Sequence, residues 1–182
     1  MPIALAARPV GPPPGLFASH CRSTMIRAIE QVVRDNPPRI DRHLAEILGA
    51  YVGEPDLLSG IACPADETRY ARHLLHAGDL YSVLAIVWMP GQMSPVHGHK
   101  TWCALGVHLG TLTEALFRPA SGGGWGLDRV VQRHPGAVSH MPENAPLSHR
   151  VANLGTTTAI SIHVYGAAFD RLGREVNRIW AS

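Results

Sequence analysis

The chain has 182 residues, of which 46% are hydrophobic and 16% charged, and its formal net charge is +2 with the histidines neutral. This composition is typical of a compact globular domain and excludes a disordered chain. The charges are scattered, so they favour neither nucleic acid nor an anionic membrane as a partner. No apolar run approaches the ~20 residues that a membrane-spanning helix needs.

Residues 1–20 are rich in proline and lack the long apolar centre of a secretory signal. They predict a stiff, poorly ordered arm ahead of one domain over residues 21–182. The cysteines lie far apart in the chain and are Cys21, Cys63 and Cys103. Because three distant cysteines do not make a disulfide framework, the sequence predicts a reducing, cytoplasmic setting. It leaves the oligomeric state open, a homo-oligomer included.

Two helices are predicted next, within residues 23–50. Apolar residues recur at helical spacing in the first helix, which Ser23 or Thr24 would cap and Pro37–Pro38 would end. Asp41 would cap the second helix. These helices are expected to form a cap on one side of the rest of the domain.

From residue 65 to about residue 170 the pattern changes to short apolar runs separated by glycine-rich breaks. The runs are YSVLAIVWMPG, TWCALGVHLG, TLTEALFR, LDRVVQRH and TTTAISIHVYG. Short strands with frequent turns predict an antiparallel barrel or sandwich behind a helical cap. The loop Ser121–Gly124 is expected to join two strands as a hairpin.

Two of these strands carry polar side chains on one face. Residues i and i+2 of a strand share a face, so His97 and His99 point the same way, as do Ser161, His163 and Tyr165. If the aliphatic face of the second strand packs outward, its polar face lies inside the barrel. Buried polar groups need each other or a metal as partners, so the pattern predicts a shared site. The alternative is an open sheet with these faces in solvent.

The spacing of the histidines resembles the two cupin motifs. The residues of the first motif are Gly91, His97, His99, Cys103 and Gly110. Cysteine stands where that motif places glutamate. His149 and Asn153, behind a proline-bearing turn, resemble the second motif. The resemblance implies a mainly β fold, the cupin (double-stranded β-helix, or jelly-roll) barrel, with an N-terminal helical cap.

Over roughly residues 65–170 the chain resembles, within the cupins, the thiol dioxygenase family, of which cysteine dioxygenase is the best-known member. The resemblance implies an Fe(II) cofactor held by three histidines and a catalytic Ser-x-His-x-Tyr strand. The implied metal ligands are His97, His99 and His149, and the implied catalytic residues are Ser161, His163 and Tyr165. It also implies that Arg72 binds the substrate carboxylate, with Tyr70 beside it.

Cys103 falls where animal members of that family have a cysteine joined to the active-site tyrosine. The resemblance therefore implies a Cys103–Tyr165 thioether, and the alternative is that Cys103 is a small buried hydrophobe. Trp88 and Trp102 are expected to pack in the core, with the pocket wall as the alternative for both.

The resemblance thus implies an Fe(II)-dependent thiol dioxygenase, whose partners are O2 and a small carboxylated thiol, and whose product is the sulfinic acid. Cysteine is the first candidate because Arg72 is present. The alternatives are 3-mercaptopropionate and mercaptosuccinate, with Arg171 or Arg174 for the extra carboxylate of the latter. Two other classes stay open: a different metal cupin, such as an isomerase or a non-thiol dioxygenase, and a non-catalytic ligand-binding cupin.

Overall fold

The computed structural model describes residues 20–172 and 176–179, so the predicted arm lies, apart from His20, outside the described residues. The first helix, α1 (His20–Asp35), begins three residues before the predicted caps and ends ahead of Pro37–Pro38, as predicted. Thr24 is an interior residue of α1, and its hydroxyl donates to the His20 carbonyl at 2.9 Å. The predicted cap at Ser23 or Thr24 is therefore wrong.

The second helix, α2 (Ile40–Tyr51), follows Arg39, whose φ of 59° places it in the left-handed region. Asp41 lies in the first turn and does not cap the helix, which corrects the prediction. Its buried carboxylate instead accepts hydrogen bonds from Arg39 at 3.2 Å and from His140 at 2.7 Å. The hydrogen bond to His140 thus connects the start of α2 to strand β7 (Val138–Met141).

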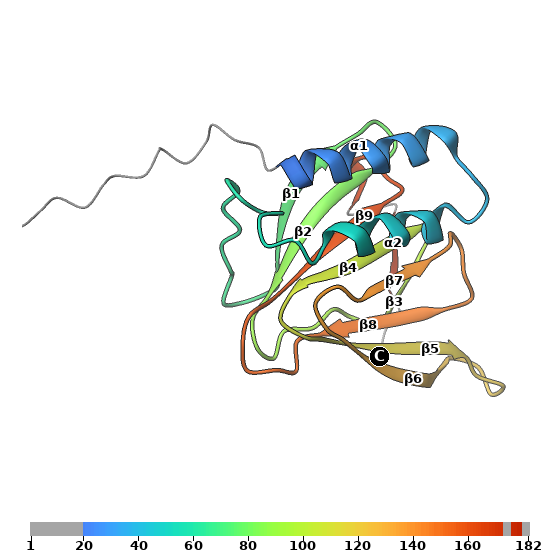
Figure 1. Cartoon of the computed structure of the whole chain (residues 1–182). Coiled ribbons are helices and arrows are strands. Elements are labelled where there is room, and N and C mark those ends of the chain that lie inside the picture. Colours follow the sequence, from blue (N-terminus) through green and yellow to red (C-terminus); the bar gives the residue numbers. More distant parts are fainter. Residues whose placement is uncertain (1–19, 173–175, 180–182) are drawn as a thin grey trace, which may run out of the picture.

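The strands form two antiparallel five-stranded sheets (Figure 1). The first sheet contains, in spatial order, β1 (Ala71–Ala77), β2 (Ser82–Trp88), β9 (Ala159–Tyr165), β4 (Cys103–Leu109) and β7 (Val138–Met141). The second contains β10 (Asn177–Ile179), β3 (His97–His99), β8 (Ser148–Ala152), β5 (Leu112–Pro119) and β6 (Trp125–Arg133). All five predicted apolar runs are strands, and Ser121–Gly124 lies in the β5–β6 hairpin.

The two helices cover the outer face of the first sheet, and the second sheet lies on the opposite side of the barrel (Figure 1). Ile162 and Val164 of β9 pack in the same buried cluster as Leu44 and Leu48 of α2. A side chain at Gly106 of β4 would come within 2.8 Å of Val52, which follows α2, so α2 packs tightly over this strand. The aliphatic face of β9 therefore points toward the helices, and its polar face points into the barrel.

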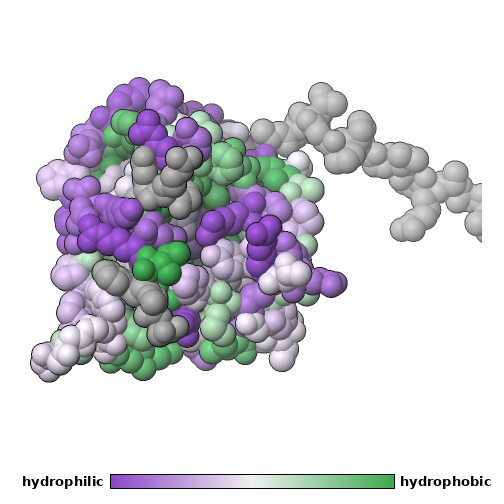
Figure 2. Space-filling view, turned by 180° about the vertical axis from the view of Figure 1, so that it is seen from behind, coloured by the Kyte–Doolittle hydropathy of each residue, from purple (hydrophilic) through white to green (hydrophobic). Residues whose placement is uncertain are grey.

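The C-terminal strand β10 was not predicted, because the expected barrel ended near residue 170. It pairs with β3 through Asn177 opposite His99 and Ile179 opposite His97. No helix among the described residues is long and apolar enough to cross a membrane. On the face seen in Figure 2, hydrophilic side chains cover much of the surface, and apolar side chains form separate patches.

Candidate active site

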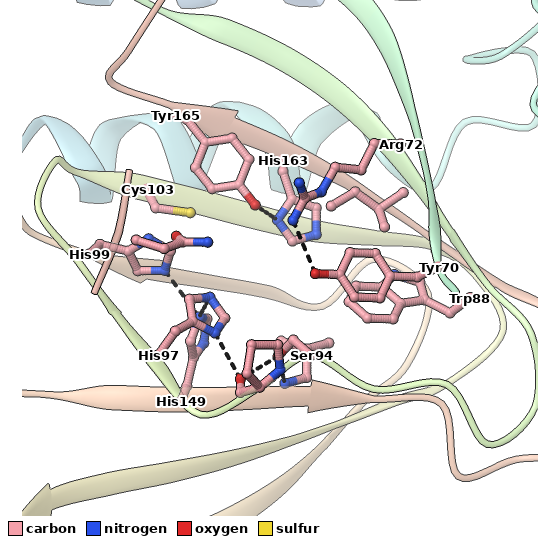
Figure 3. Close-up of a pocket in the computed structure, with 14 residues that line it drawn as sticks. Tyr70, Arg72, Trp88, Ser94, His97, His99, Cys103, His149, His163 and Tyr165 are labelled. Carbon is pink, nitrogen blue, oxygen red and sulfur yellow. Dashed lines mark hydrogen bonds between the residues drawn. The ribbon is translucent and has the colours of Figure 1, made fainter. Parts of the chain in front are cut away.

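Three buried histidines from two neighbouring strands converge inside the barrel (Figure 3). His97 and His99 lie on β3, and His149 lies on β8 directly opposite His97. The Nε2 atom of His149 is 3.0 Å from Nε2 of His99 and 3.2 Å from Nε2 of His97. The three rings thus direct nitrogen atoms toward one point.

Two of these rings make hydrogen bonds on the side that faces away from the cluster. His97 donates from Nδ1 to the Pro95 carbonyl at 3.0 Å, and His149 donates from Nδ1 to Glu114 at 2.8 Å. An imidazole that binds a metal is neutral and carries one proton, so with Nδ1 donating outward each ring would present a bare Nε2 lone pair to a metal ion. Burial lowers the pKa of His97 to about 3 and the pKa of His99 well below its usual value, so both rings are neutral at neutral pH.

These lone pairs fit a metal ion. Two such lone pairs at 3.2 Å in a buried site would repel each other, and a metal ion bound to both would remove that repulsion. Two neighbouring ligands that bind one ion at ~2.1 Å and at right angles lie about 3 Å apart. The separations of 3.0 and 3.2 Å match that value. The residues present therefore fit a metal held by imidazole, a ligand that suits iron among other transition metals.

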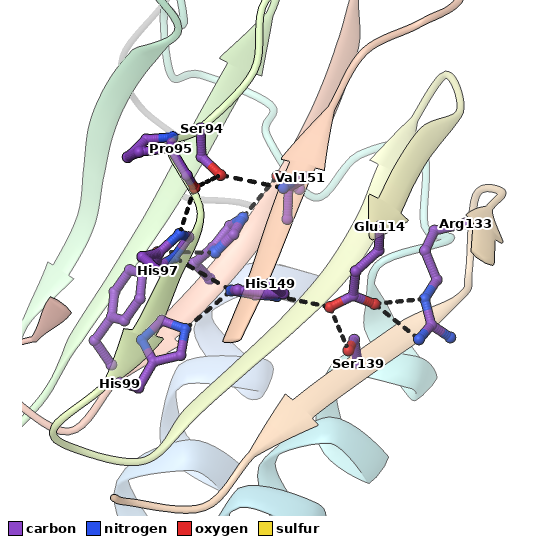
Figure 4. Close-up of polar contacts among 12 residues, drawn as sticks. Ser94, Pro95, His97, His99, Glu114, Arg133, Ser139, His149 and Val151 are labelled. Carbon is purple, nitrogen blue, oxygen red and sulfur yellow. Dashed lines mark hydrogen bonds and ion pairs between the residues drawn. The ribbon is translucent and has the colours of Figure 1, made fainter. Parts of the chain in front are cut away.

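Glu114 of β5 lies directly behind His149 (Figure 4). Its Oε1 accepts from His149 at 2.8 Å and from the Ser139 hydroxyl at 3.0 Å. Its Oε2 accepts from Arg133, at 2.9 Å from Nε and 2.8 Å from Nη2. Burial alone would raise the pKa of Glu114, but the His149 hydrogen bond and the Arg133 charge lower it to about 2. Glu114 is therefore an anion beside the histidine cluster.

A chain of hydrogen bonds runs along the inner face of β9. The Trp88 indole N–H is 2.9 Å from the Ser161 hydroxyl, which is 2.8 Å from Nε2 of His163. Nδ1 of His163 is 3.0 Å from the Tyr165 hydroxyl, which lies in the pocket (Figure 3). The serine, histidine and tyrosine are thus connected in the order predicted, with Trp88 at the end.

Trp88 sets the direction of this chain, because an indole N–H can only donate. Ser161 accepts from Trp88, and Nε2 of His163 is the one acceptor for its own proton among the described residues, so the hydroxyl donates to that nitrogen. The proton of the neutral imidazole then lies on Nδ1 and is donated to the Tyr165 oxygen. Burial raises the pKa of Tyr165 well above its usual value, so the hydroxyl keeps its own proton. That proton is available to a molecule in the pocket.

His163 should make the metal-free protein sensitive to acid. Its pKa is about 6.5 in the unfolded chain, but burial and the neighbouring His149 and Arg72 lower it to about 3 in the folded protein. Between pH 6.5 and pH 3, His163 is protonated in the unfolded chain but neutral in the folded protein. Its contribution to the free energy of unfolding is therefore complete above pH 6.5 and decreases as the pH falls toward 3. We expect His163→Gln to lose less unfolding free energy than wild type between about pH 8 and pH 4 in urea titrations. An equal loss would contradict this assignment.

Arg72, at the start of β1, lies at the other side of the pocket. It donates to the Tyr70 hydroxyl at 3.0 Å, and its guanidinium lies 5.2 Å from the centre of the Tyr70 ring. The Tyr70 ring stacks on Trp88 with 4.5 Å between ring centres. The stack holds the guanidinium in place, and its other donors have no hydrogen-bond partner among the described residues.

Cys103 of β4 stands directly opposite Tyr165 of β9 in the antiparallel ladder, and both line the pocket (Figure 3). Opposed residues in such a ladder have Cβ atoms about 4.5–5.5 Å apart, which is within reach for their side chains. Burial raises the pKa of the Cys103 thiol, so it stays protonated. The position is compatible with both the thioether and the buried hydrophobe.

A model of the family described as cysteine dioxygenase type I matches residues 16–177. The chain belongs to the cysteine dioxygenase type I family. Family membership confirms the resemblance found in the sequence, and it supports a cupin thiol dioxygenase. The cupin barrel, with two antiparallel sheets and two N-terminal helices, is likewise confirmed.

Solved structures include similar double-stranded β-helix proteins. A protein with this domain from Klebsiella pneumoniae is 17% identical, over 65% of this chain and 90% of its own, with a TM-score of 0.47. An RmlC-like cupin family protein from Methanocaldococcus jannaschii is 14% identical, over 62% and 93%, with a TM-score of 0.45. An RmlC-like cupin from Desulfovibrio desulfuricans is 22% identical, over 58% and 91%, with a TM-score of 0.42.

The structure brings the predicted site residues of this cysteine dioxygenase family member together. Those that line the pocket are Tyr70, Arg72, His97, His99, Cys103, His149, His163 and Tyr165. Ser161 lies behind the pocket, bonded to His163. Of the two tryptophans, Trp88 lines the pocket, whereas Trp102 packs against the buried cluster between the first sheet and the helices.

Sequence reasoning missed Glu114, although a signal was present. Leu112, Glu114 and Leu116 are all buried and alternate with less buried residues along β5. A charged residue between two leucines on the apolar face of a strand needs a buried partner. Asn177 was missed as well: it lines the pocket from β10, a strand that was not expected.

Proposed function

We propose that this protein is an Fe(II)-dependent dioxygenase that converts a small carboxylated thiol and O2 to the sulfinic acid, with cysteine as the first candidate. One observation carries the proposal. The ring nitrogens of His97, His99 and His149 converge in a pocket that Arg72 also lines. A cation site beside a guanidinium suits a substrate that has both a thiolate and a carboxylate.

His97, His99 and His149 would hold the iron. The iron supplies the redox chemistry that transfers both atoms of O2 to the substrate sulfur. The three ligands are neutral, so none of them would cancel the positive charge of the ion directly. That charge would lower the pKa of a thiol bound there and favour its thiolate.

Arg72 would bind the substrate carboxylate, and Tyr70 would keep the guanidinium in position. A fixed carboxylate determines where the sulfur of a small thiol lies. Mercaptosuccinate needs a second cation for its extra carboxylate. Arg171 lies on the short helix η1 (Phe169–Arg171) and is not among the described residues that line the pocket, while Arg174 lies outside the described residues. Among the described residues that line the pocket, Arg72 is the one arginine, which supports a monocarboxylate as substrate.

A metal analysis combined with a thiol panel tests the proposal. We expect the purified protein to bind one equivalent of iron and to consume O2 with cysteine or 3-mercaptopropionate, forming the sulfinate. Oxygen uptake without sulfinate would favour a different metal cupin. Ligand binding without oxygen uptake would favour a non-catalytic cupin, and either result would overturn the proposal.

Replacing Tyr165 with phenylalanine should retain iron and thiol binding but slow sulfinate formation about tenfold, because the hydroxyl proton no longer reaches the pocket. Trp88→Phe should also slow sulfinate formation. Without the indole N–H, the Ser161 hydroxyl can accept from Nε2 of His163 instead of donating to it, so the position of the proton on His163 is no longer fixed. Iron content, O2 consumed and sulfinate formed are measured for both variants. Wild-type coupling of O2 to sulfinate in Tyr165→Phe would remove the proposed role of this chain.

The Cys103–Tyr165 thioether stays a prediction. Its formation removes one hydrogen from the thiol and one from the tyrosine ring, with O2 as the electron acceptor. After turnover with iron, thiol and O2, peptide mass spectrometry should show the two segments joined and lighter by two hydrogens. Cys103→Ser is the matched control. Separate, unmodified peptides after many turnovers would contradict the cross-link and favour the buried hydrophobe.

A further inference from the structure

Glu114 has no role in the chemistry proposed above, yet it is bonded directly to a proposed metal ligand. Its side chain is 1% exposed, and its two oxygens have different partners. Oε1 accepts from His149 and Ser139, whereas Oε2 accepts, among the described residues, from Arg133 alone (Figure 4). One oxygen thus faces the metal side, and the other is occupied by a cation.

The three histidines are therefore not equivalent. The Nδ1 proton of His97 goes to the neutral carbonyl of Pro95, while that of His149 goes to the anionic Glu114. Nδ1 of His99 is buried and has no hydrogen-bond partner among the described residues. An imidazole that donates to a carboxylate is the more basic ligand, because the negative charge offsets the positive charge that develops on the ring.

Arg133 limits this effect. A buried carboxylate without a cation is unfavourable, and it would draw the His149 proton more strongly than a paired carboxylate does. The double contact at 2.8 and 2.9 Å fixes the Glu114 group and compensates its charge. The Ser139 hydroxyl holds Oε1 from the β7 side.

We infer that Glu114 is a positioning residue of the metal centre: it fixes the Nδ1 proton of His149 and supplies, through that ring, the negative charge that carboxylate ligands supply directly in other non-heme iron sites. Arg133 partly neutralises the Glu114 carboxylate and so determines how strongly its negative charge acts on the His149 ring. The inference rests on the proposed iron site. Its rival is that Glu114 and Arg133 form an ion pair that only joins β5 to β6.

The two interpretations differ in the sign of a measurable quantity. Glu114→Gln removes the negative charge near the iron, which should raise the midpoint potential of the Fe(III)/Fe(II) couple. Arg133→Gln leaves the charge of Glu114 uncompensated, which should lower that potential. A merely structural ion pair would give both variants the same change, a loss of stability.

The experiment uses the full chain with Glu114→Gln, Arg133→Gln and a matched control. Asp128→Asn removes another ion pair between β5 and β6, the 3.2 Å contact with Arg118, whose residues do not line the pocket. The iron dissociation constant is measured by competition with a chelator, together with the midpoint potential and the unfolding free energy of the metal-free protein. We expect Glu114→Gln to bind iron about 10–100-fold more weakly and Asp128→Asn to change neither iron property.

Potentials that shift in opposite directions support the inference. Shifts of the same sign, or lower stability with wild-type iron affinity and potential, overturn it. Should Glu114→Gln not fold, Arg133→Gln decides alone, because an unchanged or raised potential in that variant overturns the inference. An unmodified protein that binds no iron overturns the proposed function itself, and this failure is recognised before any variant is made.

Discussion

Replacing His149 with alanine should abolish iron binding and sulfinate formation. His149 is the histidine whose Nε2 atom lies within 3.2 Å of both other Nε2 atoms, so its loss removes the centre of the cluster. Losing a ligand should weaken iron binding by more than the ~10–100-fold that the loss of an outer hydrogen-bond partner costs. Iron content after dialysis, and O2 uptake with cysteine, measure the effect.

The matched control for this variant is His134→Ala. His134 is an exposed histidine near the end of the β5–β6 hairpin, and its ring contacts the Thr111 hydroxyl at 3.2 Å. The His134→Ala variant should have unchanged iron content and turnover. Full iron content in folded His149→Ala would show that the three histidines are not the metal site.

The second large effect is expected from Arg72→Ala. A hydrogen bond between charged groups contributes about 1.5–3 kcal/mol, so kcat/KM for carboxylated thiols should fall about 10–150-fold. Cysteamine, which lacks a carboxylate, should be used nearly as well as by the wild type. The two substrates are compared by sulfinate formation under the same O2 concentration.

Arg69→Ala is the control, because Arg69 is close in the chain but pairs with Asp66 at 3.4 Å and does not line the pocket. It should leave both substrates unaffected. An equal loss for cysteine and cysteamine in Arg72→Ala would mean that Arg72 supports the stack on Tyr70 and does not bind the substrate.

The fold could be predicted because its signals are local. The apolar runs, the glycine-rich breaks and the two-residue parity of SIHVY depend on neighbours in the chain, and they placed Ser161, His163 and Tyr165 on one inner face. The family motifs then selected His97, His99 and His149, which the structure brings together.

The features that the sequence did not predict depend on partners that are distant in the chain. Glu114 and His149 are 35 residues apart, and Trp88 and Ser161 are 73 apart, so no window of sequence links them. The register of a three-residue strand such as β10 leaves no periodic signal. Asp41 was misassigned for the same reason, because its partner His140 is 99 residues away.

The strand that carries two of the three histidines pairs with β10 along its whole length but only briefly with β8. β3 has three residues, and its pairing with β8 consists of one residue pair, His97 with His149. An ion held by both strands would add a second connection between residues that are 50 positions apart in the chain, beside the single pair of the β3–β8 ladder. Loading the metal would then rigidify this side of the barrel more than the helix-covered side, and amide hydrogen exchange in β3 and β8 would report how much metal the protein holds.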